Sequence, residues 1–311
     1  MLTLDNARRR GYPEPPIPAY RVTQGGRSLA QTFRLAGAVV LLTGAASGIG
    51  AALALGLAAK GCGLLLVDRD APGLHAVAAK ARAAGATVET LALDLADAEA
   101  ITKLPDWAAD RFGRLDVLIN NAGVALGGRF DETHLEDFDW LMDINLRAVV
   151  RMCHAFLPML RARPAAQIVN LSSLFGLIAP PGQVAYATSK FGVRGFTEAL
   201  RHEYAGSGLG VTVVHPGGVA TAIARSARGT RPPTDPDAAE RARVEDEKAR
   251  EAFGKLLTLS PEEAAAAIIQ GIERRRPRIL IGKDAKSAAL IQRLMPVGYW
   301  KTIVRLSGGK V

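Results

Sequence analysis

Seven short apolar runs, separated by alanine-rich stretches of helical spacing, constrain the fold of this chain more than any other feature. Most runs are continuously apolar rather than alternating, which is typical of strands covered by helices on both faces of a sheet. The alternation of strands with helices predicts a doubly wound, Rossmann-like three-layer α/β/α fold with a central, mostly parallel sheet. The seven expected strands are Val39 to Thr43, Gly63 to Val67, Thr87 to Leu93, Val117 to Asn120, Gln167 to Ser172, Val211 to His215 and Arg278 to Ile281.

The pattern divides the chain into a body and two ends. Residues 1–35 are rich in Pro, Gly and Arg and lack apolar periodicity, so we expect an N-terminal arm. Residues 36–283 carry the strand and helix pattern of a Rossmann-type domain. Within it, residues 221–260 turn to Arg, Pro, Asp and Glu, and we expect a lid there. Residues 284–311 are expected to form a basic, amphipathic C-terminal extension.

Positive charge is concentrated at the two ends. The chain has a net charge of +9, of which residues 1–36 contribute +4 and residues 271–311 contribute +8, so the middle carries −3. A mildly acidic body argues against a nucleic-acid-binding domain. The basic C-terminus could contact a membrane surface peripherally, but no apolar stretch is long enough to span a membrane.

Cysteines and histidines lack the spacing of a disulfide framework or a metal site. The two cysteines are Cys62 and Cys153, and the five histidines are scattered along the chain. We therefore expect no metal and a reducing compartment. The N-terminus also lacks the apolar run of a secretory signal, so a cytoplasmic location is expected.

A glycine-rich turn, TGAASGIG at residues 43–50, directly follows the first expected strand and leads into a helix. Such a turn points backbone N–H groups and the positive end of the helix at a diphosphate. Gly44 would allow the turn, while Gly48 and Gly50 would let the backbone approach a dinucleotide. An ordinary tight turn is the alternative. The expected cofactor contacts in this turn are Gly44, Ser47, Gly48, Ile49 and Gly50.

An acidic residue ends the second expected strand. Asp68 follows the glycines by about 20 residues, where a carboxylate can accept hydrogen bonds from an adenosine ribose. Its charge would repel a 2′-phosphate, which favours NAD over NADP. Arg69 could pair with such a phosphate, but the glycine turn offers no basic side chain. We therefore expect NAD, with NADP as the less favoured cofactor.

Tyr186 and Lys190 are four residues apart in a segment of helical spacing, so their side chains should share one face. A tyrosine titrates near pH ~10, and a neighbouring ammonium stabilises the phenolate and lowers that pKa toward the range useful for acid-base catalysis. Tyr186 could then exchange a proton with a substrate oxygen. Taken alone, such a pair is more often a solvated pair on a helix surface, so other motifs must decide.

Five motifs in a fixed order resemble the short-chain dehydrogenase/reductase family. They are TGAASGIG, NNAG at 120–123, NLSS at 170–173, YATSK at 186–190 and HPGGVAT at 215–221. The resemblance covers about residues 36–282 and leaves both ends of the chain unexplained. It implies hydride transfer between a nicotinamide cofactor and a small-molecule alcohol or ketone.

The resemblance also implies a catalytic tetrad of Asn145, Ser173, Tyr186 and Lys190. Ser173 would hydrogen-bond the reacting oxygen, with the adjacent Ser172 as the alternative. Tyr186 would donate or accept the proton, and Lys190 would hold the nicotinamide ribose. Asn145, in the segment DINLRAVV, would support a water-linked proton relay through a helix kink.

Further cofactor contacts follow from the same resemblance. The adenine pocket is assigned to Asp94, the adenine ribose side to residues 120–123, and the nicotinamide to residues 216–221, with Thr221 bonding the carboxamide. Beyond the glycine turn, the expected contacts are Asp68, Arg69, Asp94, Leu95, Asn121, Ala122, Gly123, Tyr186, Lys190, Pro216, Gly217, Val219 and Thr221.

These features lead to one main hypothesis and two alternatives. We expect an NAD-dependent oxidoreductase for a hydrophobic secondary alcohol and its ketone, because the expected lid and tail could wall an apolar pocket. The first alternative is an NADPH-dependent carbonyl or 3-oxoacyl reductase. The second is a non-catalytic, dinucleotide-sensing binding protein. The family often forms tetramers, so a homotetramer is expected, or else a homodimer.

Overall fold

The fold is described from a computed structural model. It describes residues 32–221 and 257–306 continuously, and isolated residues outside these ranges: Ile223, Ala227, Arg228, Glu240, Arg243, Val244, Glu247, Gly254 and Gly308. Most of the expected lid and nearly all of the expected N-terminal arm lie outside the described residues.

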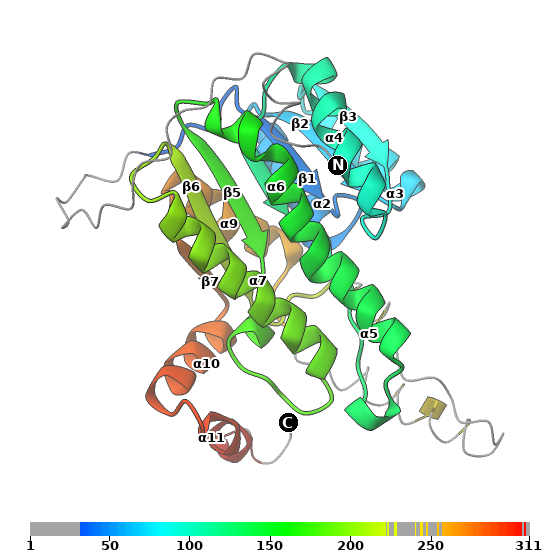
Figure 1. Ribbon diagram of the computed structural model, residues 1–311, viewed down its shortest axis with the longest axis vertical. Helices are drawn as coiled ribbons and strands as arrows, with labels where there is room; N and C mark the ends of the chain where they lie inside the picture. Colours follow the sequence, from blue (N-terminus) through cyan, green and yellow to red (C-terminus); the bar gives the residue numbers. More distant parts are fainter. Residues whose placement is uncertain are drawn as a thin grey trace.

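A seven-stranded parallel sheet forms the middle layer, as predicted (Figure 1). Its order is β3-β2-β1-β4-β5-β6-β7, so the chain moves outward in one direction from β1 and then returns to its other side at β4. Such a reversal leaves a crevice at the carboxyl ends of the two central strands. The strands are β1 (Val39–Thr43), β2 (Gly63–Asp68), β3 (Val88–Ala92), β4 (Val117–Asn120), β5 (Ala166–Leu171), β6 (Leu209–Pro216) and β7 (Arg278–Ile281).

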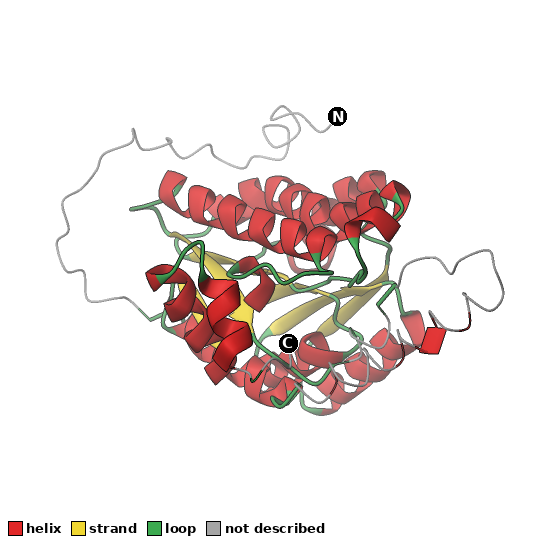
Figure 2. Ribbon diagram, turned by 90° about the horizontal axis from the view of Figure 1, so that it is seen from below, coloured by secondary structure: helices red, strands yellow, loops and turns green. Residues whose placement is uncertain are grey.

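Helices cover both faces of the sheet (Figure 2). Alternate residues of β1 explain the need for two covers, since Val40 and Leu42 belong to one apolar core while Val39 and Leu41 belong to the other. The first core includes α2 (Gly48–Ala59), α3 (Ala71–Ala83) and α9 (Pro261–Glu273). The second includes α4 (Ala98–Phe112), α6 (Ala148–Arg161) and α7 (Val184–Glu203).

Shorter elements gather near the carboxyl ends of the strands. They are the 3₁₀ turns η1 (Phe130–Glu132) and η3 (Leu174–Gly176), the helix α5 (Leu135–Met142), the π-helical turn η2 (Asp143–Arg147), and the last helices α10 (Lys283–Leu294) and α11 (Tyr299–Leu306). None of the described helices combines the length and apolar character needed to cross a membrane.

The two ends of the described chain are anchored on the body. Phe33 and Leu35 are buried in the first core, and the N–H of Phe33 donates to the carbonyl of Glu273 at 2.7 Å. The body therefore already includes residues assigned by the sequence to the arm. At the other end, Ala285 and Ala288 of α10 are buried, so the expected C-terminal extension packs on the body from its first turn.

The buried carboxylate of Asp116 connects the amino-terminal ends of β1 and β4. Asp116, which is 6% exposed, accepts a 2.8 Å hydrogen bond from the N–H of Val39 and a 2.7 Å hydrogen bond from Nε of Arg163. Arg114 forms a second ion pair with it at 3.2 Å. Asp116 therefore holds the start of β1 beside β4, and it also links both strands to Arg163, which follows α6.

We expect Asp116→Ala to lower the free energy of unfolding by about 2 kcal/mol, because the Val39 N–H loses its acceptor and a partly buried guanidinium loses its counter-charge. Urea unfolding followed by circular dichroism measures this loss. Asp110→Ala on the exposed side of α4 is the control. A loss for Asp116→Ala no larger than that of the control would contradict the role assigned to this carboxylate.

Candidate active site

The expected site residues meet at the carboxyl edge of the sheet, on the side of α10 and α11 (Figure 1). The glycine turn follows β1, the NNAG segment follows β4, and the NLSS segment follows β5. Because β1, β4 and β5 are neighbours, three motifs far apart in sequence become adjacent at the crevice.

The glycine turn is packed directly against the loop after β4. Gly44 has φ +66°, and a Cβ placed on it would lie 2.7 Å from the Ala122 Cα. Gly48 has φ +52°, and its Cβ would lie 3.0 Å from a methyl group of Thr221. A Cβ on Gly50 would overlap the carbonyl oxygen of Gly44. Gly50 is therefore needed for packing within the turn itself, in addition to any contact with a cofactor.

The geometry of the turn fits a diphosphate. Ser47 occupies the N-cap of α2, no side chain caps this helix, and its first turn carries no acidic residue. The first backbone N–H groups of the helix are therefore available to an anion, with the favourable helix dipole behind them. Asn121 holds the turn in place, since its Nδ2 donates to the carbonyls of Thr43 and Gly44, both at 3.0 Å.

Asp68 lies at the end of β2 with its carboxylate beside the glycine turn. Oδ2 accepts from the N–H of Ala46 at 2.9 Å and Oδ1 accepts from the N–H of Asp70 at 3.0 Å. A carboxylate offers about four acceptor positions, so about two remain for ribose hydroxyls. The neighbouring Arg69 is exposed.

The expected adenine and nicotinamide contacts flank this crevice. Asp94 is exposed and accepts from the N–H of Ala96 at 2.9 Å, while Leu95 is buried. Beyond the other side of the turn, Pro216 ends β6, and Gly217 begins the loop that leads to Thr221. Ile49 lies partly buried in the first turn of α2, packed against the first core.

Tyr186 and Lys190 share one face of α7, as their spacing predicts. Lys190 Nζ lies 5.6 Å from the centroid of the Tyr186 ring and donates to the carbonyl of Leu171 at 3.2 Å. Burial lowers the pKa of Lys190 to about 8. The pair is therefore not a solvated pair on a helix surface, because Lys190 is only 4% exposed.

The pKa of Tyr186 moves in the opposite direction to the one expected from the sequence. Burial raises the pKa of its hydroxyl, and a hydrogen bond with Ser173 offsets part of that rise. The ammonium of Lys190 faces the aromatic ring and the Leu171 carbonyl, so desolvation of the phenolate outweighs the attraction that the sequence suggested.

The two serines of the NLSS segment have different environments. Ser172 is buried and its hydroxyl donates to the carbonyl of Lys190 at 2.8 Å, which ties β5 to α7. Ser173 is the residue that hydrogen-bonds Tyr186, and its Oγ also accepts from the N–H of Phe175 at 3.1 Å. Geometry therefore favours Ser173 over Ser172 as the partner of a reacting oxygen.

Asn145 lies in the π-helical turn η2 and is fully buried. Its Oδ1 accepts from the N–H of Val124 at 2.8 Å, and its Nδ2 donates to the Val124 carbonyl at 2.9 Å. The helix irregularity expected at Asn145 is thus a π turn, which widens the helix at this point. A Cβ on Gly123 would lie 3.2 Å from Asn145 Oδ1 and 3.3 Å from Lys190 Nζ, so Gly123 occupies the gap between them.

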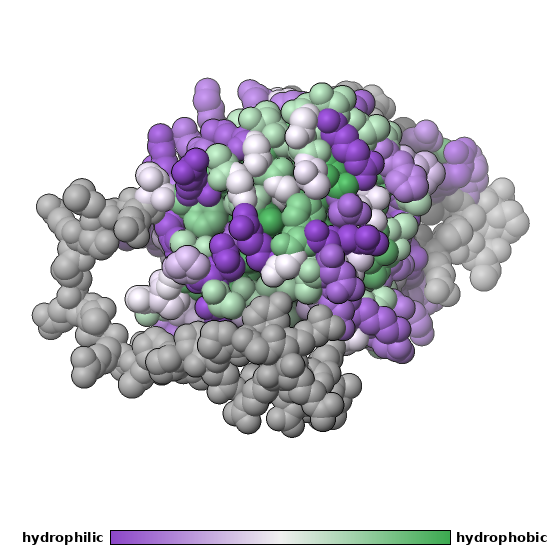
Figure 3. Space-filling view, turned by 90° about the horizontal axis from the view of Figure 1, so that it is seen from above, coloured by the Kyte–Doolittle hydropathy of each residue, from purple (hydrophilic) through white to green (hydrophobic). Residues whose placement is uncertain are grey.

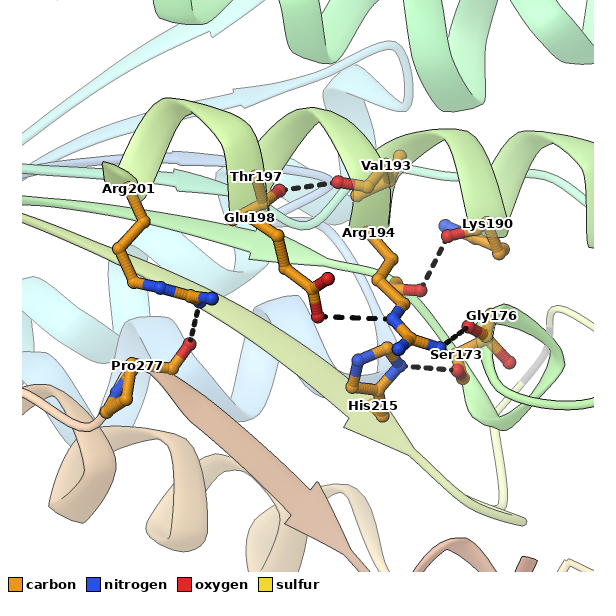
Figure 4. Close-up of polar contacts among 11 residues, drawn as sticks. Ser173, Gly176, Lys190, Val193, Arg194, Thr197, Glu198, Arg201, His215 and Pro277 are labelled. Atoms are coloured by element: carbon orange, nitrogen blue, oxygen red, sulfur yellow. Dashed lines mark hydrogen bonds and ion pairs between the residues drawn. The ribbon is translucent and has the colours of Figure 1, made fainter. Parts of the chain in front are cut away.

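One of the five scattered histidines, His215, contacts the backbone of Ser173. His215 is buried at the end of β6, and its Nδ1 lies 2.9 Å from the carbonyl oxygen of Ser173 (Figure 4). A carbonyl only accepts, so Nδ1 carries the proton. Nε2 is buried and finds no partner among the described residues. Burial, together with Arg194 and Arg278, lowers the pKa of His215 to about 4.

An aspartate from the C-terminal extension holds the expected nicotinamide loop. Asp284, in the first turn of α10, accepts from the N–H of Gly218 at 2.7 Å. A Cβ on either Gly217 or Gly282 would collide with its carboxylate. On the opposite side of the loop, Val219 bridges Leu259. No local motif marks Asp284, because its target lies 66 residues earlier.

The surroundings of Tyr186 are largely apolar. Tyr186 packs against a cluster that includes Leu126, Leu141 and Ala185, and its ring meets that of Phe175 edge-on at 6.1 Å. Arg228, from the segment expected to form the lid, lies 3.5 Å above the Trp140 ring and donates to Asp137 at 2.9 Å. No local pattern marks this contact, since Asp137 and Trp140 both lie on α5 while Arg228 follows Asp137 by 91 residues.

The described residues contain no cluster of three or more His, Cys, Asp or Glu side chains suited to a metal ion. The groups that converge at the crevice are instead backbone N–H groups, a carboxylate, a tyrosine and a lysine. This set fits a dinucleotide and proton transfer.

Comparison with known proteins agrees with this arrangement. The family model for short chain dehydrogenases matches residues 38–232. The chain belongs to the short-chain dehydrogenase family. This short-chain dehydrogenase is 42% identical over 271 residues to a Mycobacterium tuberculosis protein named as the oxidoreductase SadH, covering 86% of the chain and 94% of the relative.

Two further matches concern activity and cofactor. D-threitol dehydrogenase of Mycolicibacterium smegmatis is 40% identical over 195 residues, covering 63% of this short-chain dehydrogenase and 75% of the relative. The crystal structure of a Burkholderia phymatum short-chain dehydrogenase/reductase in complex with NAD aligns with a TM-score of 0.76 and 30% identity, covering 84% and 95% of the two chains. The chain is thus an oxidoreductase of a family that binds a nicotinamide dinucleotide.

We expect His215 to make the protein less stable in acid. The folded protein keeps His215 neutral down to about pH 4, whereas an unperturbed histidine protonates near pH 6.5. The unfolded state therefore binds more protons between these values, and the free energy of unfolding falls as the pH drops from 6.5 toward 4. The difference between the two pKa values corresponds to a decrease of about 3 kcal/mol in the free energy of unfolding.

Urea unfolding at pH 6.5 and pH ~4.5 measures most of this loss, and His215→Asn is the matched variant. Its amide N–H can replace the Nδ1–H donor but cannot titrate. The variant should lose less stability than the wild type over this interval. An equal loss in both proteins would assign the acid sensitivity to other groups.

We expect Asp284→Ala to weaken cofactor binding by about fivefold to tenfold, because the Gly218 N–H loses an acceptor and the loop from Gly217 to Thr221 loses its support. Fluorescence titration with NADH gives the Kd. Asp284→Asn retains an acceptor oxygen and should restore most of the affinity. Wild-type affinity in Asp284→Ala would contradict this positioning role.

Proposed function

We propose that this short-chain dehydrogenase transfers a hydride between NAD(H) and a hydrophobic secondary alcohol or ketone. The observation that carries the proposal is the convergence of Ser173, Tyr186 and Lys190 at a crevice whose opposite side is the glycine turn. Asn145 completes the proposed tetrad. A binding protein without turnover would not require a hydroxyl pair and a buried lysine at that place.

Bound at the crevice, a nicotinamide cofactor supplies the hydride donor or acceptor. The chain supplies the proton. Ser173 holds the substrate oxygen through its hydroxyl, and Tyr186 donates a proton to that oxygen in reduction or removes one in oxidation. Because burial raises the pKa of Tyr186, its hydroxyl stays protonated at neutral pH, which is the form that reduction needs.

Lys190 and Asn145 act around this proton transfer. Lys190, whose pKa is lowered to about 8, would bind the ribose hydroxyls and place a positive charge near Tyr186 when protonated. Asn145 holds the Val124 backbone with both ends of its amide. We assign its π turn to the support of a water-linked relay toward Lys190.

The environment of Asp68 supports NAD over NADP. Its carboxylate lies beside the glycine turn, where it would accept from ribose hydroxyls and repel a 2′-phosphate. The exposed Arg69 supports the alternative, since a guanidinium there could pair with such a phosphate. Measured cofactor preference decides between the two.

The apolar surroundings of Tyr186 support a hydrophobic substrate. Leu126, Leu141 and Phe175 lie around it, and burying apolar substrate surface there would contribute about 25 cal/mol per Å². The similarity to D-threitol dehydrogenase supports a polar polyol as the alternative substrate.

Two further assignments accompany this proposal. We propose a cytoplasmic location, supported by the free, buried thiols of Cys62 and Cys153. We also propose a homotetramer or homodimer, which light scattering of the purified protein tests.

A panel of alcohols and ketones, assayed by nicotinamide absorbance with either cofactor, tests the function. We expect turnover with NAD(H), with kcat/KM at least about tenfold higher than with NADP(H), a difference of about 1.4 kcal/mol. Aryl, alicyclic or long-chain substrates should react faster than threitol and other polyols. Tyr186→Phe should lower kcat by about 10²-fold to 10⁴-fold, because it removes only the proton donor.

Binding of NADH to Tyr186→Phe should remain close to wild type, which separates loss of chemistry from loss of folding. Cofactor binding without turnover on any substrate would overturn the enzymatic proposal and favour a dinucleotide sensor. Faster turnover with NADPH would replace NAD as the cofactor, and faster turnover of polyols would overturn the apolar substrate.

A further inference from the structure

The helices α10 and α11 expose an unusual combination of apolar and cationic side chains. Five of the twelve large hydrophobic side chains exposed among the described residues lie between residues 290 and 306. Val297, between the two helices, is 94% exposed, and Leu294 is 71% exposed. Such a concentration on a small part of the surface marks an interaction site. The five are Leu290, Leu294, Met295, Val297 and Leu306.

Apart from Asp284, the exposed residues of α10 lie on one face of the helix. They follow the helical spacing of three or four residues, while Ala285 and Ala288 on the opposite face are buried against the body. Leu290 and Leu294 are therefore neighbours on a stripe flanked by cations. The exposed stripe consists of Lys283, Lys286, Ser287, Leu290, Arg293 and Leu294.

The charge of this surface has one sign. Residues 283–306 contain five basic residues and one acidic residue, Asp284. The carboxylate of Asp284 is turned toward the Gly218 N–H on the body. On α11, Lys301 and Arg305 are exposed one turn apart, and Leu306 lies beside them.

The position of the surface is also unusual, since α10 and α11 project from the carboxyl edge of the sheet (Figures 1 and 2). Trp300 of α11 closes one side of an apolar groove of about 630 Å³, whose other side includes Val184 and Phe191 of α7. On the opposite end of the molecule, hydrophilic and hydrophobic residues are interspersed (Figure 3).

We propose that α10, α11 and the connection between them form a peripheral docking surface for an anionic lipid bilayer. Leu290, Leu294 and Val297 would enter the boundary between headgroups and acyl chains, while the lysines and arginines around them pair with lipid phosphates. Apolar side chains flanked by cations fit both components of such a surface. This inference is independent of the cofactor and substrate proposed above.

Electrostatics disfavours a second copy of the chain as the occupant. In a twofold symmetric contact the same patch lies on both sides. The cations of α10 and α11 would then face their own copies without acidic partners, which costs free energy. An anionic bilayer supplies the missing counter-charge.

Co-sedimentation of the full chain with vesicles tests the proposal. We expect binding to phosphatidylcholine vesicles that contain about one third phosphatidylglycerol, and much weaker binding to phosphatidylcholine alone. Binding should fall as salt is raised, because surface charges are screened. Each cation near the surface should contribute about fivefold in affinity, so Lys286→Glu/Arg293→Glu should reduce binding by more than tenfold.

A second variant tests the apolar contribution. Leu294→Ser/Val297→Ser leaves the charge unchanged and should reduce binding at least about tenfold, since two exposed side chains would no longer be buried in the interface. Two matched controls, Lys80→Glu/Lys103→Glu for charge and Leu135→Ser for an exposed apolar residue elsewhere, should reduce it much less. Circular dichroism and NADH binding verify that every variant is folded.

Four outcomes would overturn the proposal. Absence of binding to anionic vesicles would remove the bilayer as occupant, and concentration-dependent self-association lost in Leu294→Ser/Val297→Ser would assign the face to a second copy. Equal effects of the α10 charge reversals and the control reversals would show a general charge effect. If vesicle binding were unchanged in both Lys286→Glu/Arg293→Glu and Leu294→Ser/Val297→Ser, the binding would belong to another basic segment, such as residues 8–10.

Discussion

The close approach of two loops at the centre of the sheet is the constraint on which the rest of the site depends. Gly44, after β1, and Ala122, after β4, come so near each other that a side chain on Gly44 would collide with the Ala122 backbone. Asn121 closes the contact by donating to two carbonyls of the glycine turn. The crevice between the two halves of the sheet thus has a fixed floor, and α2 starts from it with uncapped N–H groups.

Above this contact, the polar groups of the proposed site are held in place by buried hydrogen bonds. Lys190 and Asn145 approach each other across Gly123, which has no side chain to separate them. Ser172 ties β5 to α7, and His215 holds the carbonyl of Ser173. Polar groups removed from water are costly unless paired, so these hydrogen bonds also limit the orientations open to Ser173 and Tyr186.

The C-terminal region links the site to the outer surface. Asp284 reaches back to the loop after β6, and from there α10 carries its exposed stripe away from the body. The same short helix therefore supports the expected nicotinamide loop with its first turn and presents cations and leucines along its length. A surface bound at α10 would lie close to the mouth of the crevice.

The sequence by itself determined the seven strands, the parallel sheet and the family, because continuous apolar runs and short motifs are properties of neighbouring residues. It also indicated that Tyr186 and Lys190 share a helix face, since that follows from helical spacing. Only the tertiary structure decided the direction of the Tyr186 pKa, the engagement of Ser172 with Lys190, and the roles of His215 and Asp284. Desolvation and hydrogen bonds over 42 and 66 residues depend on distances in space, which no local pattern records.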